Sequence, residues 1–580
     1  MSRLGADAVI IPGTDPHHSE YMADHWKFRE WLTGFTGSNG TAVVTQTKAL
    51  LWTDSRYFLQ AELELAGSGI ELMKENVAGE PTIEEWLAAN LHDEDTVAID
   101  GRLFSIVDAN RLEVFCGEHG FLLAPEFYVA DRLWTDRPPR PMTTVEVHDE
   151  ELAGETVESK IARVKELIED QGADSMLVAS LDDIAWLFNL RGSDVARTPV
   201  TIAFAYLGER SNDIFIDEQK LSPEAKAHLK RYHVGVRDYD DILRFLERRN
   251  EGDVILLDPN SVSDSLGQAL MCGKVYAASP IAKLKSIKNE AQIAGFRRAH
   301  ESDGVALARL IRRLKSGVAS GETLTEVDVQ TLAIELRRQA DADYRDESFD
   351  LIAGYADHGA IVHYTATPES AYTLKPEGLL LIDTGGQYLC GTTDVTRTIA
   401  LGTTTAEQRR DYTLVLKGHL ALQGAQFPRG TRGDQLDALA RLPLWKEGVN
   451  FGHGTGHGVG HYLSVHEGPQ SIRMDHNPTT LKPGMVTSDE PGIYRTGKHG
   501  IRVENLLLTV ASDIDSEFGE FLHFEPLTLV PYERELIDTA MLTDEERRQI
   551  DLYHRMVLDR LSPRLDGDDL AWLTEACRPL

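Results

Sequence analysis

The stretch from Phe451 to Pro469 reads FGHGTGHGVGHYLSVHEGP and places several histidines among closely spaced glycines. These histidines are His453, His457, His461 and His466. Imidazole is a good ligand for borderline divalent metals, and glycine lets a backbone fold tightly around an ion or a substrate. For any single one of them, a glycine-rich loop with solvent-exposed histidines is an equally good interpretation. The segment therefore needs support from elsewhere in the chain.

Carboxylates flank this segment on both sides. Upstream, LLLIDTGGQYLCGTTDVTRTIALG carries Asp383 and Asp394 in β-rich runs, with a Gly-Gly turn signal between them. Two neighbouring strands could therefore present both side chains to one point. Downstream, Glu490 lies in TSDEPGIY, and Glu504 precedes the strand-like run NLLLTV. Each has an ordinary explanation as a turn or solvated-strand residue, but together they offer four carboxylates and an imidazole.

A charge balance indicates what such a set would hold. Four carboxylates in contact with one another cannot be buried unpaired, so they must either protonate or bind cations. Two divalent ions would neutralise them. Ligation mainly by oxygen, with a single nitrogen, favours ions such as Mn, Co or Zn over copper or an iron–sulfur cluster. Two such ions can hold a water between them as hydroxide near neutral pH, which suits hydrolysis.

The series Asp383, Asp394, His457, Glu490 and Glu504 resembles the dimetal site of the pita-bread peptidases. Within that group, four further segments resemble the three-domain, animal-type Xaa-Pro aminopeptidases (aminopeptidase P). They are WTDSRYFLQ at 52–60, HGAIVHY at 358–364, GHGTGHGVG at 452–460 and PLTLVPY at 526–532. The resemblance covers nearly the whole chain. It implies a metallopeptidase that removes the N-terminal residue from peptides with proline in the second position.

The resemblance also implies the roles of the ligands. Asp383 would bind one divalent ion, and Asp394 and Glu504 would bridge two, with Mn²⁺ favoured and Zn²⁺ or Co²⁺ as alternatives. His457 and Glu490 would complete the second ion. A hydroxide bridging the two metals would attack the carbonyl of the bond before proline. Glu490 would act as general base and acid.

Other residues are expected to bind substrate rather than metal. By resemblance, His363, His466 and, less clearly, His453 would contact the substrate and stabilise the oxyanion on its carbonyl. His461 reads as an exposed loop residue. Arg56 matches an arginine that reaches substrate from the N-terminal domain, although an arginine beside Asp54 is more often a surface ion pair. Arg502, two residues before Glu504, is expected to support the ligand carboxylates.

A short internal sequence repeat predicts two related N-terminal domains. Gly172-Ala173-Asp174 repeats Gly5-Ala6-Asp7, and a Trp-Leu and a Gly-Ser pair recur after each copy. Proline-rich DRPPRPM at 136–142 and acidic EVHDEELAGE have the composition of a linker. We therefore expect two related α/β domains at 1–140 and 141–285, and the family resemblance implies that they are creatinase-like. The resemblance also implies an α+β pita-bread catalytic domain with a C-terminal extension at 286–580.

Helical spacing predicts several amphipathic helices. One begins near Glu158, and another contains Leu307 and Leu314 and ends before Ser316-Gly317. Capping boxes begin two more, at Thr325 and at Thr543. The last of these belongs to the C-terminal extension, which in the animal-type family contributes to a homodimer. Packing of this extension against its own domain is an equally good interpretation.

Composition limits the alternatives. The chain has 580 residues and a net charge of −34, which argues against binding to nucleic acid. The apolar runs are too short for a membrane span, and the N-terminus has no secretory signal, so we expect a cytoplasmic protein that does not associate with membranes. The four cysteines are scattered, as is typical of reduced thiols.

Two other functions compete with this one. A prolidase, which cuts Xaa-Pro dipeptides, would share the chemistry, but the duplicated N-terminal region and the C-terminal extension favour aminopeptidase P. Pita-bread domains also serve as non-catalytic protein-binding modules. Those relatives depart from the ligand set, whereas all five positions here carry side chains able to bind a metal.

Overall fold

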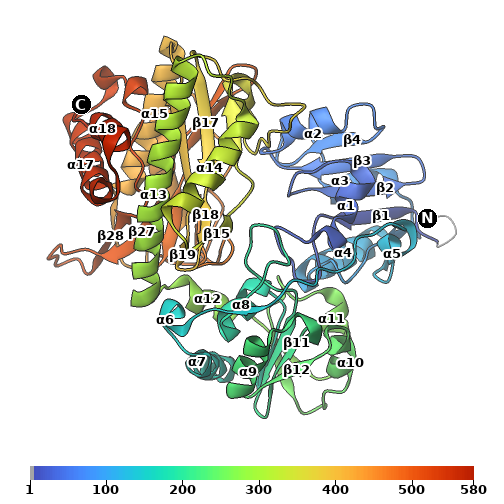
Figure 1. The fold of residues 1–580 in the computed structure, drawn as a ribbon. Coiled ribbons are helices and arrows are strands. Elements are labelled where there is room, and N and C mark those ends of the chain that lie inside the picture. Colours follow the sequence, from blue (N-terminus) through green and yellow to red (C-terminus); the bar gives the residue numbers. More distant parts are fainter. Residues whose placement is uncertain (1–4) are drawn as a thin grey trace. The chain divides into compact units, whose positions relative to one another are not determined.

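The computed structural model describes residues 5–580. The prediction that the N-terminus has no secretory signal rests partly on residues 1–4, which lie outside the described residues. The chain forms two compact units, Met1–Ala282 and Lys283–Leu580. Figure 1 labels many of their helices and strands.

The first unit contains two mixed sheets of six strands each. The strands of the first are β1 (Ala8–Pro12), β2 (Thr41–Thr45), β3 (Ala49–Thr53), β4 (Glu71–Lys74), β5 (Thr96–Ala98) and β6 (Leu122–Ala124). Those of the second are β8 (Ser175–Val178), β10 (Phe204–Gly208), β11 (Asn212–Phe215), β12 (Val234–Arg237), β13 (Val254–Leu257) and β14 (Gly273–Tyr276). The orders β4-β3-β2-β1-β5-β6 and β12-β11-β10-β8-β13-β14 are equivalent, with β8 in the place of β1. Both central strands pair antiparallel on one side and parallel on the other.

The repeated Gly-Ala-Asp motif makes the same contacts in both copies. The Asp7 backbone N–H donates to Thr96 O at 2.9 Å, and the Asp7 carboxylate accepts from the Thr96 N–H at 2.9 Å. Asp174 makes the same pair with Val254, at 2.8 and 2.9 Å. The aspartate thus clamps the start of the neighbouring parallel strand. The predicted duplication of an α/β domain is confirmed.

Helices pack around both sheets. Around the first they are α1 (Phe28–Thr33), α2 (Phe58–Glu64), α3 (Ile83–Asn90), α4 (Ile106–His119) and α5 (Val129–Leu133). Around the second they are α6 (Glu150–Ala153), α7 (Val157–Asp170), α8 (Leu181–Phe188), α9 (Pro223–Arg231), α10 (Ile242–Glu247) and α11 (Asp264–Ala269), with the short pair β7 (Glu146–Val147) and β9 (Leu190–Arg191). Helix α7 confirms the helix predicted from Glu158. The proline-rich stretch 136–142 has no helix or strand, as expected of a linker.

The second unit holds curved antiparallel sheets. Its strands are β15 (Tyr344–Glu347), β16 (Ile352–Tyr355), β17 (Leu379–Thr384), β18 (Gly386–Tyr388), β19 (Gly391–Thr392), β20 (Val395–Ala400), β21 (Gln426–Pro428), β22 (Gly456–His457), β23 (Ser471–Ile472), β24 (Val486–Asp489), β25 (Gly492–Arg495), β26 (His499–Arg502), β27 (Asn505–Ala511) and β28 (Phe521–Pro526). The two that matter most for the site have orders β16-β17-β20 and β21-β28-β27-β24. In Figure 1, helices α13 (Glu290–Ala319), α14 (Glu326–Ala340) and α15 (Ala406–Gln423) cover one side of these strands.

The remaining helices are α12 (Pro280–Ser286), α16 (Gly433–Trp445), α17 (Asp544–Leu561) and α18 (Gly567–Ala576). The predicted end of the helix before Ser316-Gly317 is wrong, because α13 continues to Ala319. A glycine inside a helix costs about 1 kcal/mol relative to alanine. Here a Cβ on Gly317 would lie 2.6 Å from Arg313 Nη1 and 2.8 Å from Glu322 Oε2, so a larger residue would have to displace the ends of these two side chains.

Capping boxes begin helices as expected. Thr325 with Asp328 caps α14, and Thr543 with Glu546 caps α17. Other boxes, which were not predicted, include Thr82 with Glu85 at α3, Asn289 with Gln292 at α13 and Thr405 with Gln408 at α15. In the C-terminal extension Leu573 is fully buried in the core of its own domain, together with Val557 and Leu561 of α17. Packing within the domain therefore accounts for these apolar side chains.

A buried histidine of α17 gives the domain a specific sensitivity to acid. The His554 Nε2 accepts a hydrogen bond from the Tyr532 N–H at 3.0 Å, so this nitrogen must carry no proton. Burial, with smaller contributions from Arg397 and Arg534, lowers the pKa of His554 from 6.5 to about 3. Below pH 6.5 this histidine therefore binds a proton in the unfolded chain but not in the folded chain. The free energy of unfolding consequently falls as the pH falls from 6.5 towards 3.

We expect His554 to lower the free energy of unfolding by about 2–3 kcal/mol between pH 6.5 and 4.5, since each unit of pKa difference is worth about 1.4 kcal/mol. Urea unfolding of the full chain at both pH values measures this loss. His554→Gln keeps a neutral acceptor, so it should lose less stability than the wild type over the same interval. The matched control, His476→Gln, changes a largely exposed histidine and should follow the wild type. Equal losses in all three proteins would contradict the assignment.

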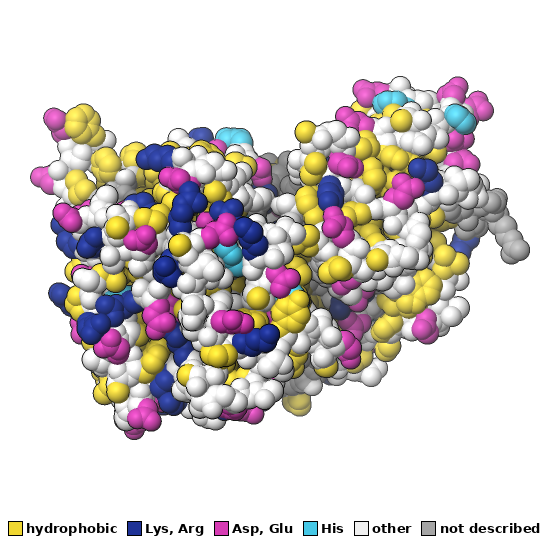
Figure 2. Space-filling view, turned by 90° about the horizontal axis from the view of Figure 1, so that it is seen from above, with side chains coloured by type: hydrophobic (Ala, Val, Ile, Leu, Met, Phe, Trp, Pro, Cys, Tyr) yellow, Lys and Arg dark blue, Asp and Glu magenta, His cyan; other side chains and the backbone are white. Residues whose placement is uncertain are grey.

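Among residues 5–580, no helix is both long and apolar enough to cross a membrane. On the face shown in Figure 2, basic side chains (dark blue) lie among the acidic ones (magenta). All four cysteines, Cys116, Cys272, Cys390 and Cys577, are free thiols.

Candidate metal centre

Strand pairing places the first two carboxylates close to each other. Strand β17 is buried along its whole length and pairs antiparallel with β20, so that Asp383 lies opposite Thr396. Asp394 immediately precedes β20 and is also buried. The segment between the two strands contains the short hairpin β18–β19 and returns the chain, so both aspartates lie at the same end of the sheet, as the sequence predicted.

The two glutamates are brought together in the same way. Strands β24 and β27 pair antiparallel with Asp489 opposite Asn505, so Glu490, which follows β24, and Glu504, which precedes β27, share one end of the ladder. The Glu504 N–H donates to Thr396 O at 3.1 Å. This hydrogen bond ties the glutamate ladder to strand β20, which carries the second aspartate.

Glycines allow the histidine segment to enter this space. A Cβ on Gly456 would lie 1.9 Å from the Ser488 carbonyl oxygen, and one on Gly458 would lie 2.0 Å from that of Glu467. Only glycine fits such close backbone contacts. The His457 N–H donates to Ser488 Oγ at 2.9 Å, which fixes the backbone from which the imidazole projects.

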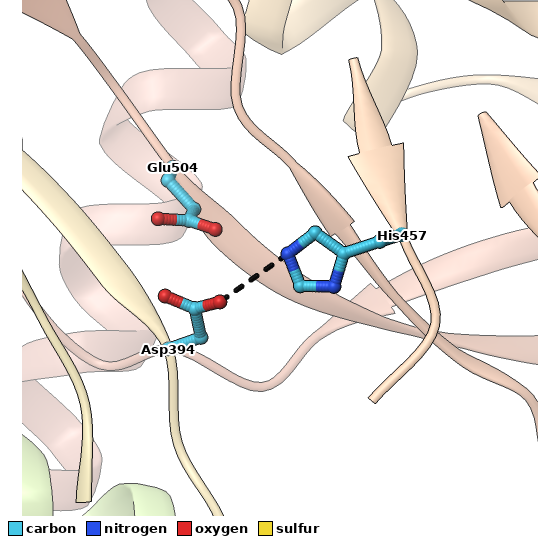
Figure 3. Close-up of side chains that lie close together, drawn as sticks. All are labelled: Asp394, His457 and Glu504. Carbon is cyan, nitrogen blue, oxygen red and sulfur yellow. Dashed lines mark ion pairs between the residues drawn. The ribbon is translucent and has the colours of Figure 1, made fainter. Parts of the chain in front are cut away.

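Three of the predicted ligands form a close group. Asp394, His457 and Glu504 each offer a ligand atom within 4.8 Å of the others, and Figure 3 shows the three side chains pointing toward one another. The His457 Nε2 lies 3.4 Å from Asp394 Oδ2 and 3.4 Å from Glu490 Oε1. The fourth predicted ligand, Glu490, therefore borders the same space.

The fifth predicted ligand, Asp383, has an oxygen available for a ligand. Its Oδ2 accepts a hydrogen bond from Arg502 Nη2 at 2.5 Å, but its Oδ1 is buried without a hydrogen-bond partner. A buried carboxylate oxygen without a partner is costly unless something else binds it. A cation at this position would satisfy it, so the residues present fit a metal site.

The pKa values of the predicted carboxylate ligands also indicate a site that lacks positive charge. Burial raises the pKa of Glu490 to about 7, although the charge of His457 opposes it, and burial also raises the pKa of Asp383. Burial and the charges of Asp394 and Glu490 raise the pKa of Glu504 well above its usual range. Without cations, this protein environment therefore disfavours the charged forms of Asp383, Glu490 and Glu504. Divalent ions would supply the missing positive charge, as the sequence argument required.

His457 responds in the opposite direction. Burial lowers its pKa, but the hydrogen bond to Asp394 and the charges of Glu490 and Asp394 outweigh burial and raise the pKa to about 9. The surrounding carboxylates thus attract positive charge at the position where the imidazole nitrogen meets them.

The other histidines occupy three different environments. The His466 ring lies 4.3 Å from that of His457, centroid to centroid. The His453 Nε2 hydrogen-bonds Tyr494 Oη at 2.8 Å, and this tyrosine accepts a hydrogen bond from Arg502 Nη1 at 2.7 Å. The expectation that His461 is exposed is wrong, because it is 2% exposed and packs edge-on against Phe296. The glycines around it allow the loop to fold inward rather than into solvent.

A buried ion triplet holds the segment that carries His466. Its neighbour Glu467 accepts hydrogen bonds from Lys285 Nζ at 2.9 Å and from Lys288 Nζ at 2.5 Å. All three side chains are at most 6% exposed. The Glu467 N–H also donates to Gly458 O at 2.8 Å, which joins this segment to the backbone beside His457.

The structure tests the predicted role of Arg502 but not that of Arg56. Arg502 is buried, binds Asp383, and donates from Nε to Thr396 Oγ1 at 3.1 Å, so it contacts one carboxylate of the predicted ligand set directly. Arg56 belongs to the first unit and forms a two-point ion pair with Asp54, at 2.9 and 2.7 Å. Its contact with substrate stays a prediction, as does that of His363.

Two residues of the site, Thr396 and Tyr494, were not predicted from the sequence. Thr396 Oγ1 donates to Glu504 Oε2 at 2.7 Å, and Tyr494 links His453 to Arg502. Thr396 could have been found, because it lies two residues after Asp394 and side chains at that spacing share a face of a strand. Tyr494 has no such signal.

Comparison with known families agrees with this architecture. Residues 294–511 match metallopeptidase family M24, and residues 520–580 match the C-terminal region of that peptidase. Residues 1–122 and 136–292 match creatinase/prolidase N-terminal domains. The fold and the site thus define an M24 metallopeptidase with two creatinase-type N-terminal domains before a pita-bread catalytic domain.

Relatives of the whole chain identify the family more closely. Aminopeptidase P2 of Arabidopsis thaliana is 39% identical, over 100% of this chain and 86% of that protein. A probable Xaa-Pro aminopeptidase P of Laccaria bicolor is also 39% identical, over 100% and 92%. The chain belongs to the aminopeptidase P family.

Solved structures show the same fold. The X-prolyl aminopeptidase of Caenorhabditis elegans, described as a cytosolic enzyme with a di-nuclear active site, superposes with a TM-score of 0.96 at 34% identity. The match covers 99% of this chain and 95% of that one. An Xaa-Pro dipeptidase of Bacillus anthracis shares the fold over 65% of this chain, with a TM-score of 0.52 at 22% identity.

Proposed function

We propose that this chain is a metal-dependent aminopeptidase that hydrolyses the N-terminal Xaa-Pro bond of peptides. The observation that carries the proposal is the convergence of Asp394, His457 and Glu504 beside the partnerless Oδ1 of Asp383. Full-length relatives named Xaa-Pro aminopeptidase P support the choice of substrate.

Two divalent ions occupy the site in this proposal. Asp383 would hold one of them, His457 and Glu490 the other, and Asp394 and Glu504 would contribute to holding both. Mn²⁺ fits a donor set of four carboxylates and one imidazole, and Zn²⁺ or Co²⁺ are the alternatives. When bound, the ions polarise the scissile carbonyl and lower the pKa of a bound water.

The side chains of the protein move protons and hold the substrate. Glu490 takes the proton of the attacking water and returns it to the proline nitrogen that leaves. His363 and His466 donate hydrogen bonds to the substrate and to the oxyanion that forms on its carbonyl, with His453 beside them. Arg56 is assigned to substrate binding from the N-terminal domain.

The remaining assignments belong to the same proposal. The chain is a cytoplasmic homodimer of three domains, 1–140, 141–285 and 286–580, which acts on peptides and binds neither nucleic acid nor membranes. The cytosolic relative of known structure supports the compartment, and the net charge of −34 supports the exclusion of nucleic acid.

Substrate length and chelation test the function. Purified enzyme should cleave Xaa-Pro-Xaa tripeptides in preference to Xaa-Pro dipeptides, lose this activity to a chelator, and regain it with Mn²⁺. Metal analysis should find two ions per chain. A preference for dipeptides would indicate a prolidase. Full metal occupancy without any hydrolysis would indicate a non-catalytic binding module.

A further inference from the structure

A long irregular loop follows β16 and carries His363. It begins with the short helical turn Ala356–Ala360 and continues without helix or strand until β17 begins at Leu379. Loops of this length with little secondary structure are uncommon in compact domains and are usually functional. A loop that must hold a side chain in one place also needs anchors that replace the hydrogen bonds of a sheet.

One buried carboxylate collects several of the hydrogen bonds of this loop. Glu326, the first residue of α14, is 0% exposed. Its Oε1 accepts from the Tyr355 N–H at 2.7 Å, and its Oε2 accepts from the Tyr372 N–H at 2.8 Å and from the Tyr364 hydroxyl at 3.0 Å. The His358 Nδ1 lies 3.0 Å from each oxygen. Donors from both ends and the middle of the loop thus meet at one side chain.

Two further contacts hold the same loop. The His358 ring stacks on Tyr372, with centroids 3.6 Å apart. The backbone of Gly359 passes so close to Gly500 of β26 that a Cβ on Gly500 would lie 1.5 Å from Gly359 O. Strand β26 also carries Arg502, so the loop is packed directly against the element that supports the ligand carboxylates.

The loop reaches the metal centre through a shared guanidinium group. Arg502 Nη2, which binds Asp383, also donates to Val362 O at 3.4 Å. The residue before His363 is therefore held by Arg502, and the residue after it, Tyr364, is held by Glu326. His363 sits between two fixed neighbours, one on the metal side and one on the side of α14.

We propose that Glu326 is a positioning residue for the reaction: it fixes the loop from Tyr355 to Tyr372 so that His363 meets the substrate. The inference rests on the proposed function, because it takes the role of His363 from there. A carboxylate suits the task since it accepts several hydrogen bonds and donates none. With an amide in its place, whichever way it is turned, the NH₂ group faces a backbone N–H of Tyr355 or Tyr372.

Glu326→Gln tests the inference with Glu335→Gln as its matched control. Glu335 lies on the same helix, is exposed, and loses the same charge. We expect Glu326→Gln to lower kcat/KM on an Xaa-Pro-Xaa peptide by about 10- to 100-fold, since misplacing a group by about 1 Å has effects of this size. The metal content should stay at the wild-type value. Backbone hydrogen exchange at Tyr355 and Tyr372 should accelerate in this variant, and the control should match the wild type in every measurement.

A double-mutant cycle separates positioning from general damage. In a His363→Ala background, Glu326→Gln should reduce kcat/KM by less than about twofold, because the group that it positions is gone. Reductions that multiply independently would overturn the inference, as would wild-type exchange and activity in Glu326→Gln. Should that variant fail to fold, Tyr364→Phe removes one hydrogen bond to Glu326, together with a contact to Ser370 that Ser370→Ala removes by itself, and should show the same loss in a milder form.

The same measurements distinguish this inference from the proposed function. If the wild type does not cleave Xaa-Pro peptides, the proposed function fails, whereas hydrogen exchange still reports whether Glu326 orders the loop. If the wild type is active and His363→Ala is as active as the wild type, the role of His363 fails, and the inference about Glu326 fails with it.

Discussion

Asp394→Asn is expected to abolish peptide hydrolysis and to remove both metal ions. Asp394 is buried and lies 3.4 Å from the His457 Nε2, within the closest group of ligand atoms. An amide is a poor ligand where a bridging carboxylate is required, so neither ion keeps its full coordination. The activity should fall by at least about 10³-fold, because metal ions supply several kcal/mol to such reactions and each 1.4 kcal/mol or so is tenfold.

The measurement is metal analysis together with kcat/KM, and stability provides an independent readout. In the metal-free protein the substitution removes the repulsion between Asp394 and the other carboxylates but also its ion pair with His457, so the unfolding temperature should change little. Added Mn²⁺ should stabilise the wild type and have no effect on the variant. Asp513→Asn, in an exposed loop, is the control and should behave as the wild type. A variant that retained two ions and full activity would refute the assignment.

Local sequence signals predicted most of the fold. The Gly-Ala-Asp repeat identified two related domains because Asp7 and Asp174 make the same backbone hydrogen bonds in both copies. The helix beginning after Thr325 was found from its capping box, since the cap is made by residues three positions apart. The end of α13 was missed because Ser316-Gly317 resembles a stop signal, and only tertiary packing shows that the glycine lies inside the helix.

The site was predictable where neighbouring strands decide it and unpredictable where distant segments meet. Asp383 and Asp394 lie on either side of the short hairpin β18–β19, at the ends of paired strands, so their convergence follows from local pairing. The burial of His461 depends on Phe296, far away in the chain. The contacts of Glu326 likewise join the start of α14 to the loop before β17, as far along as Tyr372. No periodicity or motif in a single sequence reports such contacts.

His466→Ala is expected to lower kcat by about 10²- to 10³-fold while both metal ions stay bound. The loss has this size because a hydrogen-bond donor aimed at a developing oxyanion acts mainly in the transition state. The His466 ring lies 4.3 Å from that of His457, which places it beside the ligands without making it part of the closest ligand group. KM should change little, since a contact made only in the transition state affects kcat rather than ground-state binding.

The contacts of the neighbouring residue should preserve the loop structure in His466→Ala. The adjacent Glu467 is held by Lys285 and Lys288 in a buried triplet that the substitution does not touch. The loop should therefore keep its backbone position when the imidazole is removed. His476→Ala, ten residues further on and largely exposed, is the matched control and should retain the wild-type kcat. Loss of metal from His466→Ala would instead show that this imidazole belongs to the coordination sphere, and it would remove the distinction between metal ligands and substrate-binding histidines on which the proposed mechanism depends.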